Sequence, residues 1–530
     1  MSVFDETRMA DAAPAVMPEL LEEPPRPRLS FARVLLAVLL LAGVAGAAAY
    51  AIERRVAGTL ASPSAVFAPY VDVTLTPTYA FQDPIANPVQ RVVLGFVVAQ
   101  PSHSCAPSWG GYYSPAQAES ALNLDQRVLQ VRAQGGAATI SFGGQANTEL
   151  AVSCGSVPAL SAAYLDVLKH YRISSADFDI EGAALTDAAA NARRATAVAE
   201  VQRRMAAGGG HLRVWLTLPV TPTGLTAAGL DVVRSMLAAH VQVTGVNVMA
   251  MDFAVTHAVR TNMIGAVESS LVHAHDQLIV LDQGAHLAGG SAAAWSRLGV
   301  TVMSGQNDFL HEVFTVADAR ALAAFVEQHH IAQISMWSLN RDSECGNVFV
   351  EVGVVSNVCS GVNQTPLEFT HIFSTLPGTI VADTRVAPAI PQVSSTSVDN
   401  PVSSPYPVWQ STAAYPAGYK VVWHHAVYQA MWFAQGQAPN TPVASAGQSP
   451  WLLLGPVLAG EPAVTPKLLA AGVHSTWSIT TAYRAGDRVL YGGLPFEAKW
   501  YSQGVAPDTN LPESSGSPWL PLFTLPGEPG

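Results

Sequence analysis

The sequence predicts an α/β protein built as a (β/α)8 TIM barrel, followed by two small all-β modules. Eight short apolar, β-branched runs recur with helix-like periodicity between them. A row of carboxylates, Asp177, Asp179 and Glu181, stands at the end of the fourth run. A repeat with a constant offset, for example Trp409 and Trp477, fills the C-terminal part.

The composition narrows the functional classes. The chain has 530 residues, enough for one large domain and one or two small ones. Its net charge is −12, only 12% of its residues are charged, and its globular part has no basic cluster, which argues against nucleic acid as a partner. The histidines are scattered and no Cys-x-x-Cys spacing occurs, so we expect no metal site.

The composition of the N-terminal region indicates a targeting segment. Residues 1–30 are rich in Pro, Ala and Glu and predict a disordered cytoplasmic tail. Within residues 31–55, Val34 to Ile52 are uncharged and just long enough to cross a bilayer, as a retained signal-anchor or a cleavable signal peptide. Arginines before the segment favour an N-in orientation. Either form exports the rest of the chain, to the outer face of the cell membrane or into the medium.

Four cysteines are an even number in a chain that we expect to be exported. We prefer the pairing of Cys105 with Cys154 and of Cys345 with Cys359, because each pair falls within one stretch of the predicted barrel.

The predicted barrel covers residues 66–380, with helices such as Thr186–Ala207 and Val316–His330 between its strands. The stretch between the first two strands contains prolines and is too short for a full helix, so the first unit should be irregular. His329 and His330 are expected at a helix end. The predicted strands are Tyr70–Leu75, Arg91–Ala99, Ala137–Phe142, Ala176–Ile180, Leu212–Leu218, Val243–Met251, Val300–Met303 and Gln333–Trp337.

The carboxylate row is the most informative motif. Successive side chains of a strand point to opposite faces, so Asp177, Asp179 and Glu181 share one face and Phe178 and Ile180 the other. Carboxylates spaced roughly 6–7 Å apart raise one another's pKa, as a general acid working near neutral pH requires. A solvent-facing acidic edge strand is the alternative, and the two apolar residues argue against it.

Other polar residues follow the predicted strands, where barrel enzymes place their active sites. Each has an ordinary loop interpretation, and their common position favours a joint site. They are Gln100, Ser141 with Gly143 and Gly144, Asp252, Gln306 to Asp308, and Trp337 to Asn340.

Residues Ala176 to Gly182 resemble the fourth-strand signature of glycoside hydrolase family 18, the chitinases, Asp-x-x-Asp-x-Asp-x-Glu. The resemblance implies that Glu181 is the general acid, that Asp179 orients the substrate acetamide, and that Asp177 supports Asp179. The first Asp of the pattern is Ser174 here, a departure that affects the support of the catalytic pair more than the pair itself.

Three further segments carry the resemblance. Ser141 to Gly144 is similar to the third-strand Ser-x-Gly-Gly, and Met249 to Phe253 to the sixth-strand segment, with Met251 and Phe253 where relatives place tyrosines. These departures put the rate in doubt, not the reaction type. Trp337 matches the eighth-strand tryptophan beneath the sugar. The expected substrate-binding residues of the barrel are Ser141, Gly143, Gly144, Met249, Met251, Asp252, Gln306, Asn307 and Trp337.

The resemblance also implies a mechanism. Family 18 is the substrate-assisted exception among retaining glycosidases, in which the 2-acetamido oxygen of the sugar attacks its own anomeric carbon. Such a substrate is chitin or a chitooligosaccharide, and neither a metal nor an organic cofactor is needed.

The C-terminal region reads as a linker and two copies of one module. Residues 386–407, rich in Pro, Ser, Val and Thr, predict an extended linker before modules at 408–455 and 476–523. The gapless matches, each offset by 68 residues, are Trp409/Trp477, Tyr415/Tyr483, Gly418/Gly486, Val421/Val489, Tyr428/Phe496, Ala430/Ala498, Trp432/Trp500, Gln435-Gly436/Gln503-Gly504, Pro439/Pro507 and Trp451/Trp519.

The copies resemble the chitin-binding modules of carbohydrate-binding families 5 and 12. The resemblance implies that Trp432-Phe433 and Trp500-Tyr501 lie against the polysaccharide, with Phe433 and Tyr501 as the exposed members. The sequence thus predicts a chitinase with tandem binding modules. The alternatives are a catalytically inactive chitin-binding lectin and an endo-β-N-acetylglucosaminidase acting on glycoprotein glycans or peptidoglycan.

Overall fold

We describe the protein from a computed structural model. The segment Val34–Ile52, the predicted membrane or signal segment, lies outside the residues that the structure describes. Among the described residues no helix combines the length and apolar character needed to cross a membrane. The described residues are 65–101, 103–253, 262–287, 289–346, 355–379, 399–401, 403–443, 446–461, 468–507 and 517–523.

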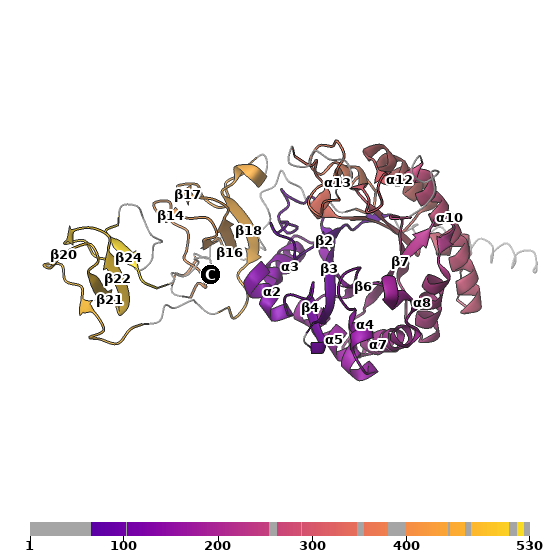
Figure 1. Ribbon diagram of the computed structural model, residues 1–530, viewed down its shortest axis with the longest axis horizontal. Coiled ribbons are helices and arrows are strands. Elements are labelled where there is room, and N and C mark those ends of the chain that lie inside the picture. The colour runs from indigo at the N-terminus through magenta and orange to yellow at the C-terminus, as the bar shows by residue number, and fades with distance from the viewer. Residues whose placement is uncertain are drawn as a thin grey trace, which may run out of the picture. The chain divides into compact units, whose positions relative to one another are not determined.

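Nine parallel strands form one sheet that closes on itself as a TIM-like barrel (Figure 1). β1 pairs with β13 and β2 pairs with β3, and only Ala68 and Pro69 separate β1 from β2, so the two ends of the sheet meet. In sheet order the strands are β1 (Val66–Phe67), β13 (Gln333–Trp337), β10 (Leu298–Met303), β9 (Gly245–Met249), β7 (Arg213–Thr221), β6 (Ser175–Asp179), β5 (Ala137–Gly143), β3 (Arg91–Gln100) and β2 (Tyr70–Asp72).

All eight predicted strands are present, with shifted ends, and β1 is an additional short strand. No helix lies between β2 and β3, which agrees with the predicted irregularity there. The expected helix end at His329 and His330 is confirmed, since His330 is the C-cap in a left-handed conformation. The helices of the barrel region are α2 (Pro115–Leu122), α3 (Leu124–Ala133), α4 (Leu150–Ser153), α5 (Val157–His170), α6 (Gly182–Thr186), α7 (Ala188–Ala207), α8 (Ala227–Ala238), α10 (Met263–Gly284), α11 (Ser291–Trp295), α12 (Val316–His329), α13 (Glu368–Phe373) and the 3-10 turn η1 (Leu339–Arg341).

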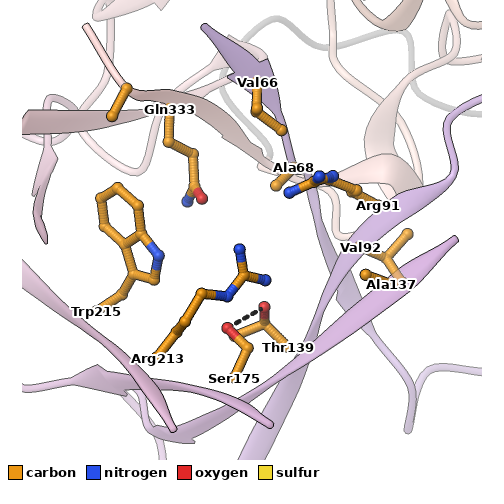
Figure 2. Close-up of a pocket in the computed structure, with 11 residues that line it drawn as sticks. Val66, Ala68, Arg91, Val92, Ala137, Thr139, Ser175, Arg213, Trp215 and Gln333 are labelled. Carbon is orange, nitrogen blue, oxygen red and sulfur yellow. Dashed lines mark hydrogen bonds between the residues drawn. The ribbon is translucent and has the colours of Figure 1, made fainter. Parts of the chain in front are cut away.

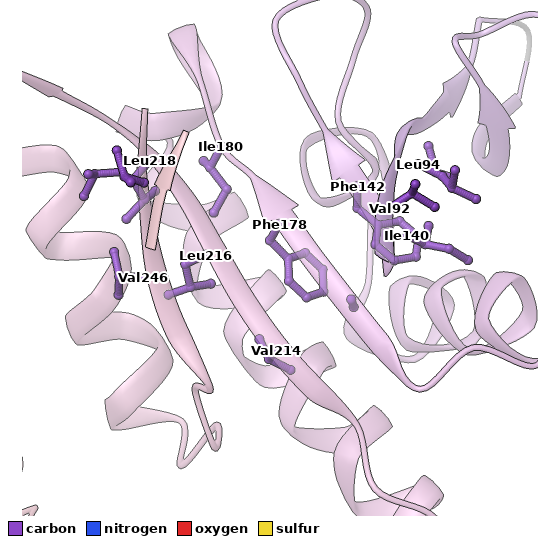
Figure 3. Close-up of a cluster of buried hydrophobic side chains, with 14 of the residues drawn as sticks. Val92, Leu94, Ile140, Phe142, Phe178, Ile180, Val214, Leu216, Leu218 and Val246 are labelled. Atoms are coloured by element: carbon purple, nitrogen blue, oxygen red, sulfur yellow. The ribbon is translucent and has the colours of Figure 1, made fainter. Parts of the chain in front are cut away.

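The core between strands and helices is apolar, as Figure 3 shows for side chains of β3, β5, β6, β7 and β9. Phe178 of β6 stacks on Phe142 with ring centroids 5.5 Å apart, and both rings contact Tyr164 of α5. Phe178 and Ile180 are fully buried here, so the predicted apolar face of the carboxylate strand is confirmed. The carboxylate face therefore points into the barrel.

Further strands pair with barrel strands or with each other. β4 (His103–Trp109) pairs antiparallel with β3, β8 (Gly224–Leu225) with β7, and β11 (Gly305–Gln306) with β12 (Val313–Phe314). Both predicted disulfides, Cys105–Cys154 and Cys345–Cys359, are present.

The C-terminal region forms small, mainly antiparallel sheets whose strands repeat at the offset of the sequence repeat. The first copy has β14 (Ala414–Tyr415), β15 (Lys420–Trp423), β16 (Ala426–Ala430), β17 (Ala434–Gln435) and β18 (Trp451–Pro456), with the turn η2 (Ala446–Gln448). The second copy has β20 (Ala482–Tyr483), β21 (Arg488–Tyr491), β22 (Leu494–Ala498), β23 (Ser502–Gln503) and β24 (Trp519–Pro521), preceded by β19 (Ser475–Thr476).

The first copy also contacts the barrel. Gln82 donates a hydrogen bond to the Leu453 carbonyl in β18 at 2.8 Å, and Lys420 donates one to the side chain of Asn123 at 2.5 Å. Gly455 of β18 approaches the Gln126 carbonyl of α3 so closely that a Cβ there would lie 2.3 Å from the oxygen. This copy is therefore packed on α3, and no such contact is seen for the described residues of the second copy.

Candidate active site

The three carboxylates lie where β6 ends and α6 begins. Asp177 and Asp179 belong to β6, and Glu181 is the N-cap residue of α6 with extended backbone. Alternation along the strand brings all three to the inner face of the barrel. Asp177 and Asp179 are buried and Glu181 is partly exposed. Because Glu181 is more exposed than Asp177 and Asp179, it is the carboxyl that a substrate in the barrel mouth can reach.

Asp177 accepts hydrogen bonds from three hydroxyl groups on other barrel strands, β2, β5 and β7. Tyr70 and Ser141 donate to Oδ2 at 2.8 and 2.6 Å, and Thr217 donates to Oδ1 at 2.6 Å. Burial raises the pKa of Asp177, and these three bonds oppose the rise because they stabilise the carboxylate. Asn247 extends the network, donating to Thr217 at 3.0 Å and to Thr301 at 2.6 Å.

Asp179 has less support than Asp177. Its Oδ1 atom is buried and has no hydrogen-bond partner among the described residues. Burial raises the pKa of Asp179 well above its ordinary value, and the charges of Glu181 and Asp177 act in the same direction. Asp179 is therefore the carboxyl of the row most strongly held in its protonated form, with an oxygen free to meet a ligand.

Glu181 has the pKa of a general acid. Burial and the nearby charge of Asp252 raise its pKa to about 7. A hydrogen bond with Asp179 opposes the rise by stabilising the Glu181 carboxylate. Near neutral pH, Glu181 is thus present in both protonation states, which suits a group that first gives and then takes a proton.

Asp252 follows β9 and is held by the loop after β10. Its carboxylate accepts the Asp308 amide N–H at 2.7 Å, and its own N–H donates to the Asn307 side chain at 3.3 Å. Burial and Asp308 raise the pKa of Asp252 to about 6. Asp252 is therefore charged before Glu181 as the pH rises, and its charge keeps the proton on Glu181.

Gly143 and Gly144 are positions where a side chain does not fit. A Cβ on Gly143 would lie 2.0 Å from the Asp179 carbonyl oxygen, and one on Gly144 would lie 2.8 Å from the Phe96 ring. Both residues have positive φ, 111° and 86°. They therefore set the close approach of β5 to β6 and of the backbone to Phe96.

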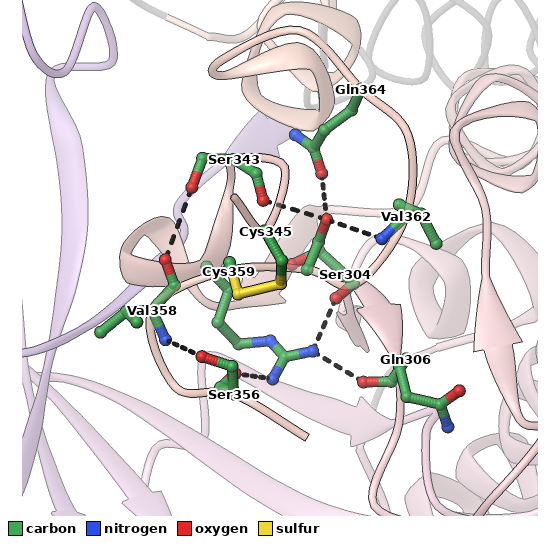
Figure 4. The surroundings of a disulfide bond; sticks show 11 residues. Ser304, Gln306, Ser343, Cys345, Ser356, Val358, Cys359, Val362 and Gln364 are labelled. Atoms are coloured by element: carbon green, nitrogen blue, oxygen red, sulfur yellow. Dashed lines mark hydrogen bonds between the residues drawn. A yellow bond between two sulfur atoms is a disulfide. The ribbon is translucent and has the colours of Figure 1, made fainter. Parts of the chain in front are cut away.

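Gln306 and Asn307 are buried, and their side-chain amides bind the loop backbone. Gln306 donates to the carbonyls of Asn307 and Phe309 at 2.9 and 3.0 Å, and Asn307 to that of Met303 at 3.1 Å. The Gln306 N–H donates to the carbonyl of Ser360, the residue after Cys359, and Figure 4 shows Gln306 in the surroundings of the Cys345–Cys359 disulfide. The structure thus shows both amides fixing the loop that holds Asp252.

Trp337 lies at the end of β13 and is partly exposed. Its ring stacks on Phe96 with centroids 5.4 Å apart and lies 6.2 Å from the Tyr70 ring. Met251 is buried and Met249 partly exposed. The predicted barrel residues are thus all at the carboxyl ends of their strands, with an aromatic wall beside the carboxylates.

The sequence interpretation missed Tyr70, Thr217 and Asn247, because a strand pattern does not reveal which polar side chains meet across a barrel. A polar residue inside an apolar run, such as Asn247 between Val246 and Val248, was the available signal. Ser174, by contrast, is exposed just before β6, and the hydroxyl donors to Asp177 come from other strands.

The repeated modules carry a second candidate site. Trp432 and Trp500 are each 43% exposed, and Phe433 and Tyr501 each 63%, so equivalent positions have equal exposure. The other repeated aromatics form the two small cores: Tyr415, Tyr428 and Trp451 in the first copy and Tyr483, Phe496 and Trp519 in the second. Each module therefore presents an adjacent pair of aromatic rings to solvent.

Comparison with known proteins finds relatives for about half of the chain. No family model matches the chain. The chain is 35% identical over 290 residues to a probable bifunctional chitinase/lysozyme of Escherichia coli K12, and 33% identical over 287 residues to endochitinase 11 of Metarhizium anisopliae. These alignments cover 53% of this chain, and 31% and 53% of the two relatives.

Among solved structures, a chitinase domain is also similar to this chain. The second active domain of a Pyrococcus furiosus chitinase, in catalytic-site mutants, is 26% identical with a TM-score of 0.51, covering 59% of this chain and 95% of that one. The same mutant domain has been solved with chito-oligosaccharides, at the same identity and TM-score. The similarity thus spans nearly the whole Pyrococcus domain and about half or less of each curated relative.

Proposed function

We propose that this protein is a chitinase that hydrolyses β-1,4 bonds between N-acetylglucosamine units. The observation that carries the proposal is the carboxylate row itself, in which Glu181 has a pKa of about 7 beside the buried Asp179 and Asp177. The similarity of about half of the chain to chitinases from three organisms supports it.

The proposed mechanism is retaining and substrate-assisted. Asp179, with an unpaired buried oxygen, orients the 2-acetamido group of the sugar so that its carbonyl oxygen attacks the anomeric carbon. Glu181 gives its proton to the glycosidic oxygen as that bond breaks. Water then attacks the anomeric carbon of the oxazolinium intermediate, Glu181 takes the water proton, and the acetamide is released. Asp177, held by its three hydroxyl donors, helps to keep the proton on Asp179 through its charge.

The decisive experiment compares the full-length protein with its Glu181→Gln variant on colloidal chitin, following the release of reducing ends. Loss of the acid should lower the rate by about 10²–10⁴-fold. Glu119→Gln is the matched control, because Glu119 on α2 also has a pKa raised to about 7 and lies outside the site. Equal rates for the parent and Glu181→Gln would leave no role for this carboxylate.

The same assay tests the lectin alternative. An inactive chitin-binding lectin would bind to chitin in a pull-down experiment. It would release no more reducing ends from chitin than the Glu181→Gln variant does. The intact network around Asp177 argues against this alternative, because three donors to one buried carboxylate are a specific arrangement with no need in a pure binding protein.

An endo-β-N-acetylglucosaminidase acting on other glycans is the second alternative, and the Escherichia coli relative is named a probable bifunctional chitinase/lysozyme. Cleavage of chitotetraose should be compared with that of a high-mannose glycopeptide and of purified peptidoglycan. A chitinase turns over chitotetraose fastest, whereas preference for either other substrate would assign the site to that glycan.

The two modules and the N-terminal region complete the proposal. The exposed pairs Trp432-Phe433 and Trp500-Tyr501 would hold the enzyme on chitin. Export is supported by the two disulfides, which persist in oxidising compartments. Cell fractionation and N-terminal sequencing of the mature protein would show whether residues 31–55 stay attached, and a reduced cytosolic protein would contradict export.

A further inference from the structure

The amino-terminal end of the barrel, opposite the candidate active site, contains a cavity of about 140 Å³. Its volume is roughly ten times the 10–15 Å³ that a single water molecule requires. The cavity is lined by residues at or near the starts of the barrel strands (Figure 2): Val66, Ala68, Arg91, Val92, Ala137, Thr139, Ser175, Arg213, Trp215, Ala332 and Gln333.

Two arginines converge in this cavity without a carboxylate. Arg91 is the first residue of β3 and Arg213 the first residue of β7, and Figure 2 shows both guanidinium groups reaching into the same space. None of the lining residues is acidic, and among the described residues neither arginine has an ion-pair partner. Burial and the positive charge of Arg91 lower the pKa of Arg213. Two cations thus face each other in a partly buried space.

The other side chains that line the cavity are held in place, and two of them can donate hydrogen bonds into it. Thr139 donates its hydroxyl hydrogen to Ser175 at 3.0 Å, which leaves the Ser175 hydroxyl hydrogen available to the cavity. Gln333 donates one amide hydrogen to Ser335 at 3.1 Å and keeps a second. Gly245 and Gly299 make room for the Trp215 ring, since a Cβ on either would lie 3.0 Å or less from it. The ring is therefore a fixed wall.

We propose that this cavity is a binding site for a doubly charged tetrahedral oxyanion, phosphate or sulfate, free or as the end group of a larger molecule. A dianion neutralises both arginines, and their planar forks match tetrahedral oxygens with paired N–H donors. Ser175 and Gln333 supply neutral donors to the remaining oxygens. Asp179 and Glu181 lie at the other end of β6, whereas Asp177, in the middle of that strand, is the register partner of Trp215.

The test measures phosphate binding to the full-length protein by isothermal titration calorimetry and thermal unfolding, with sodium chloride matched for ionic strength because salt screens such contacts. Phosphate and sulfate should raise the melting temperature by at least about 2 °C over the chloride reference. Arg91→Gln and Arg213→Gln should each weaken binding at least about tenfold, since each removes a charged hydrogen-bonding partner.

Arg234→Gln is the charge-matched control, because Arg234 is an exposed residue of α8 whose charge is lost without touching the cavity. Arg213→Lys keeps the charge and should retain part of the affinity if Arg213→Gln folds poorly. Comparing the affinity for phenyl phosphate with that for inorganic phosphate distinguishes the two sources. If phenyl phosphate binds more tightly, the ligand is a phosphate group on a larger molecule; if it binds more weakly, the ligand is the free ion. The proposal is overturned if phosphate acts no better than chloride, or acts equally on the Arg91→Gln/Arg213→Gln double variant. Chitin hydrolysis by these variants should stay unchanged, so the result does not depend on the proposed activity.

Discussion

At the scale of single residues, the pKa of Glu181 links the structure to the pH dependence of catalysis. Its pKa of about 7 means that the proton needed for leaving-group protonation is lost as the pH rises through neutrality. We expect kcat/KM on chitotetraose to fall about tenfold per pH unit above that value. A pH–rate profile of the parent and of Glu119→Gln checks this, and a rate that stays level from pH 6 to 9 would contradict it.

The same pKa predicts a pH-dependent stability difference. A carboxyl whose pKa rises from 4.5 to about 7 on folding stabilises the protein fully below pH 4.5 and loses that contribution as the pH rises through 7. Glu181→Gln lacks this loss. Because Glu181 is partly exposed, we expect the variant to gain about 1–2 kcal/mol over the parent between pH 4 and pH 8. Thermal unfolding of both proteins at the two pH values measures it; a melting-temperature difference independent of pH would count against the raised pKa.

Tyr70 is expected to act through Asp177. Its hydroxyl is one of three donors that oppose the rise in the pKa of Asp177, so Tyr70→Phe should raise that pKa further and disturb Asp179. We predict about tenfold lower kcat, the effect of losing one hydrogen bond to a charged group, with little change in KM. Tyr79→Phe is the control: it also removes a phenol hydrogen bond, a partly buried one to the Ala86 carbonyl, but away from the site. Equal losses of kcat in both variants would make the Tyr70 effect merely structural.

At the scale of elements, the approach of β5 to β6 predicts that Gly143 tolerates no side chain. Gly143→Ala would set a Cβ against the Asp179 carbonyl and impose an unfavourable φ, so we expect a loss of about 3 kcal/mol or more and a large loss of activity. Gly209→Ala, also at positive φ but with open space around it, should cost only about 1 kcal/mol. Denaturant unfolding compares the two, and similar costs would mean that the strands can move apart.

The sequence predicted the secondary-structure elements better than it predicted the contacts between side chains that are distant in sequence. The eight barrel strands were predictable because strands buried on both faces appear as continuous apolar runs. β4 was missed since its sequence, His103–Trp109, is largely polar and contains Pro107. The meeting of Tyr70 and Thr217 at Asp177, and of Arg91 and Arg213 below it, depends on barrel closure and register, which local patterns do not contain. The strand pattern also does not show that the Gln306 side chain donates to the Asn307 and Phe309 carbonyls, and its assignment to substrate stays a prediction.

At the scale of the whole molecule, the constant offset of the repeat is confirmed by strands and by exposure. Equivalent strands begin 68 residues apart, as with Ala414 and Ala482, and the equivalent aromatic pairs are equally exposed. Two similar sites on one chain raise the effective concentration of each for a repetitive insoluble ligand. A soluble oligomer that fills only the barrel gains nothing from them. The modules should therefore affect activity on solid chitin alone.

We predict that Trp432→Ala/Phe433→Ala and Trp500→Ala/Tyr501→Ala each lower activity on crystalline chitin several-fold, and that combining them lowers it more than either alone. Turnover of chitotetraose should not change. Ile479→Ala is the control, since Ile479 is 63% exposed in the second module and lies outside the aromatic pair.

Deleting residues 409–530 should also lower activity on crystalline chitin but not on chitotetraose. This deletion is harder to interpret than the point variants. The first module packs on α3 through β18, so its removal exposes apolar and polar groups of the barrel that are normally covered. A stability loss in the deletion variant would then lower activity on both substrates for a reason unrelated to binding. The point variants keep this contact. Equal losses on crystalline chitin and chitotetraose in the point variants would therefore show that the aromatic pairs do not act as independent binding sites.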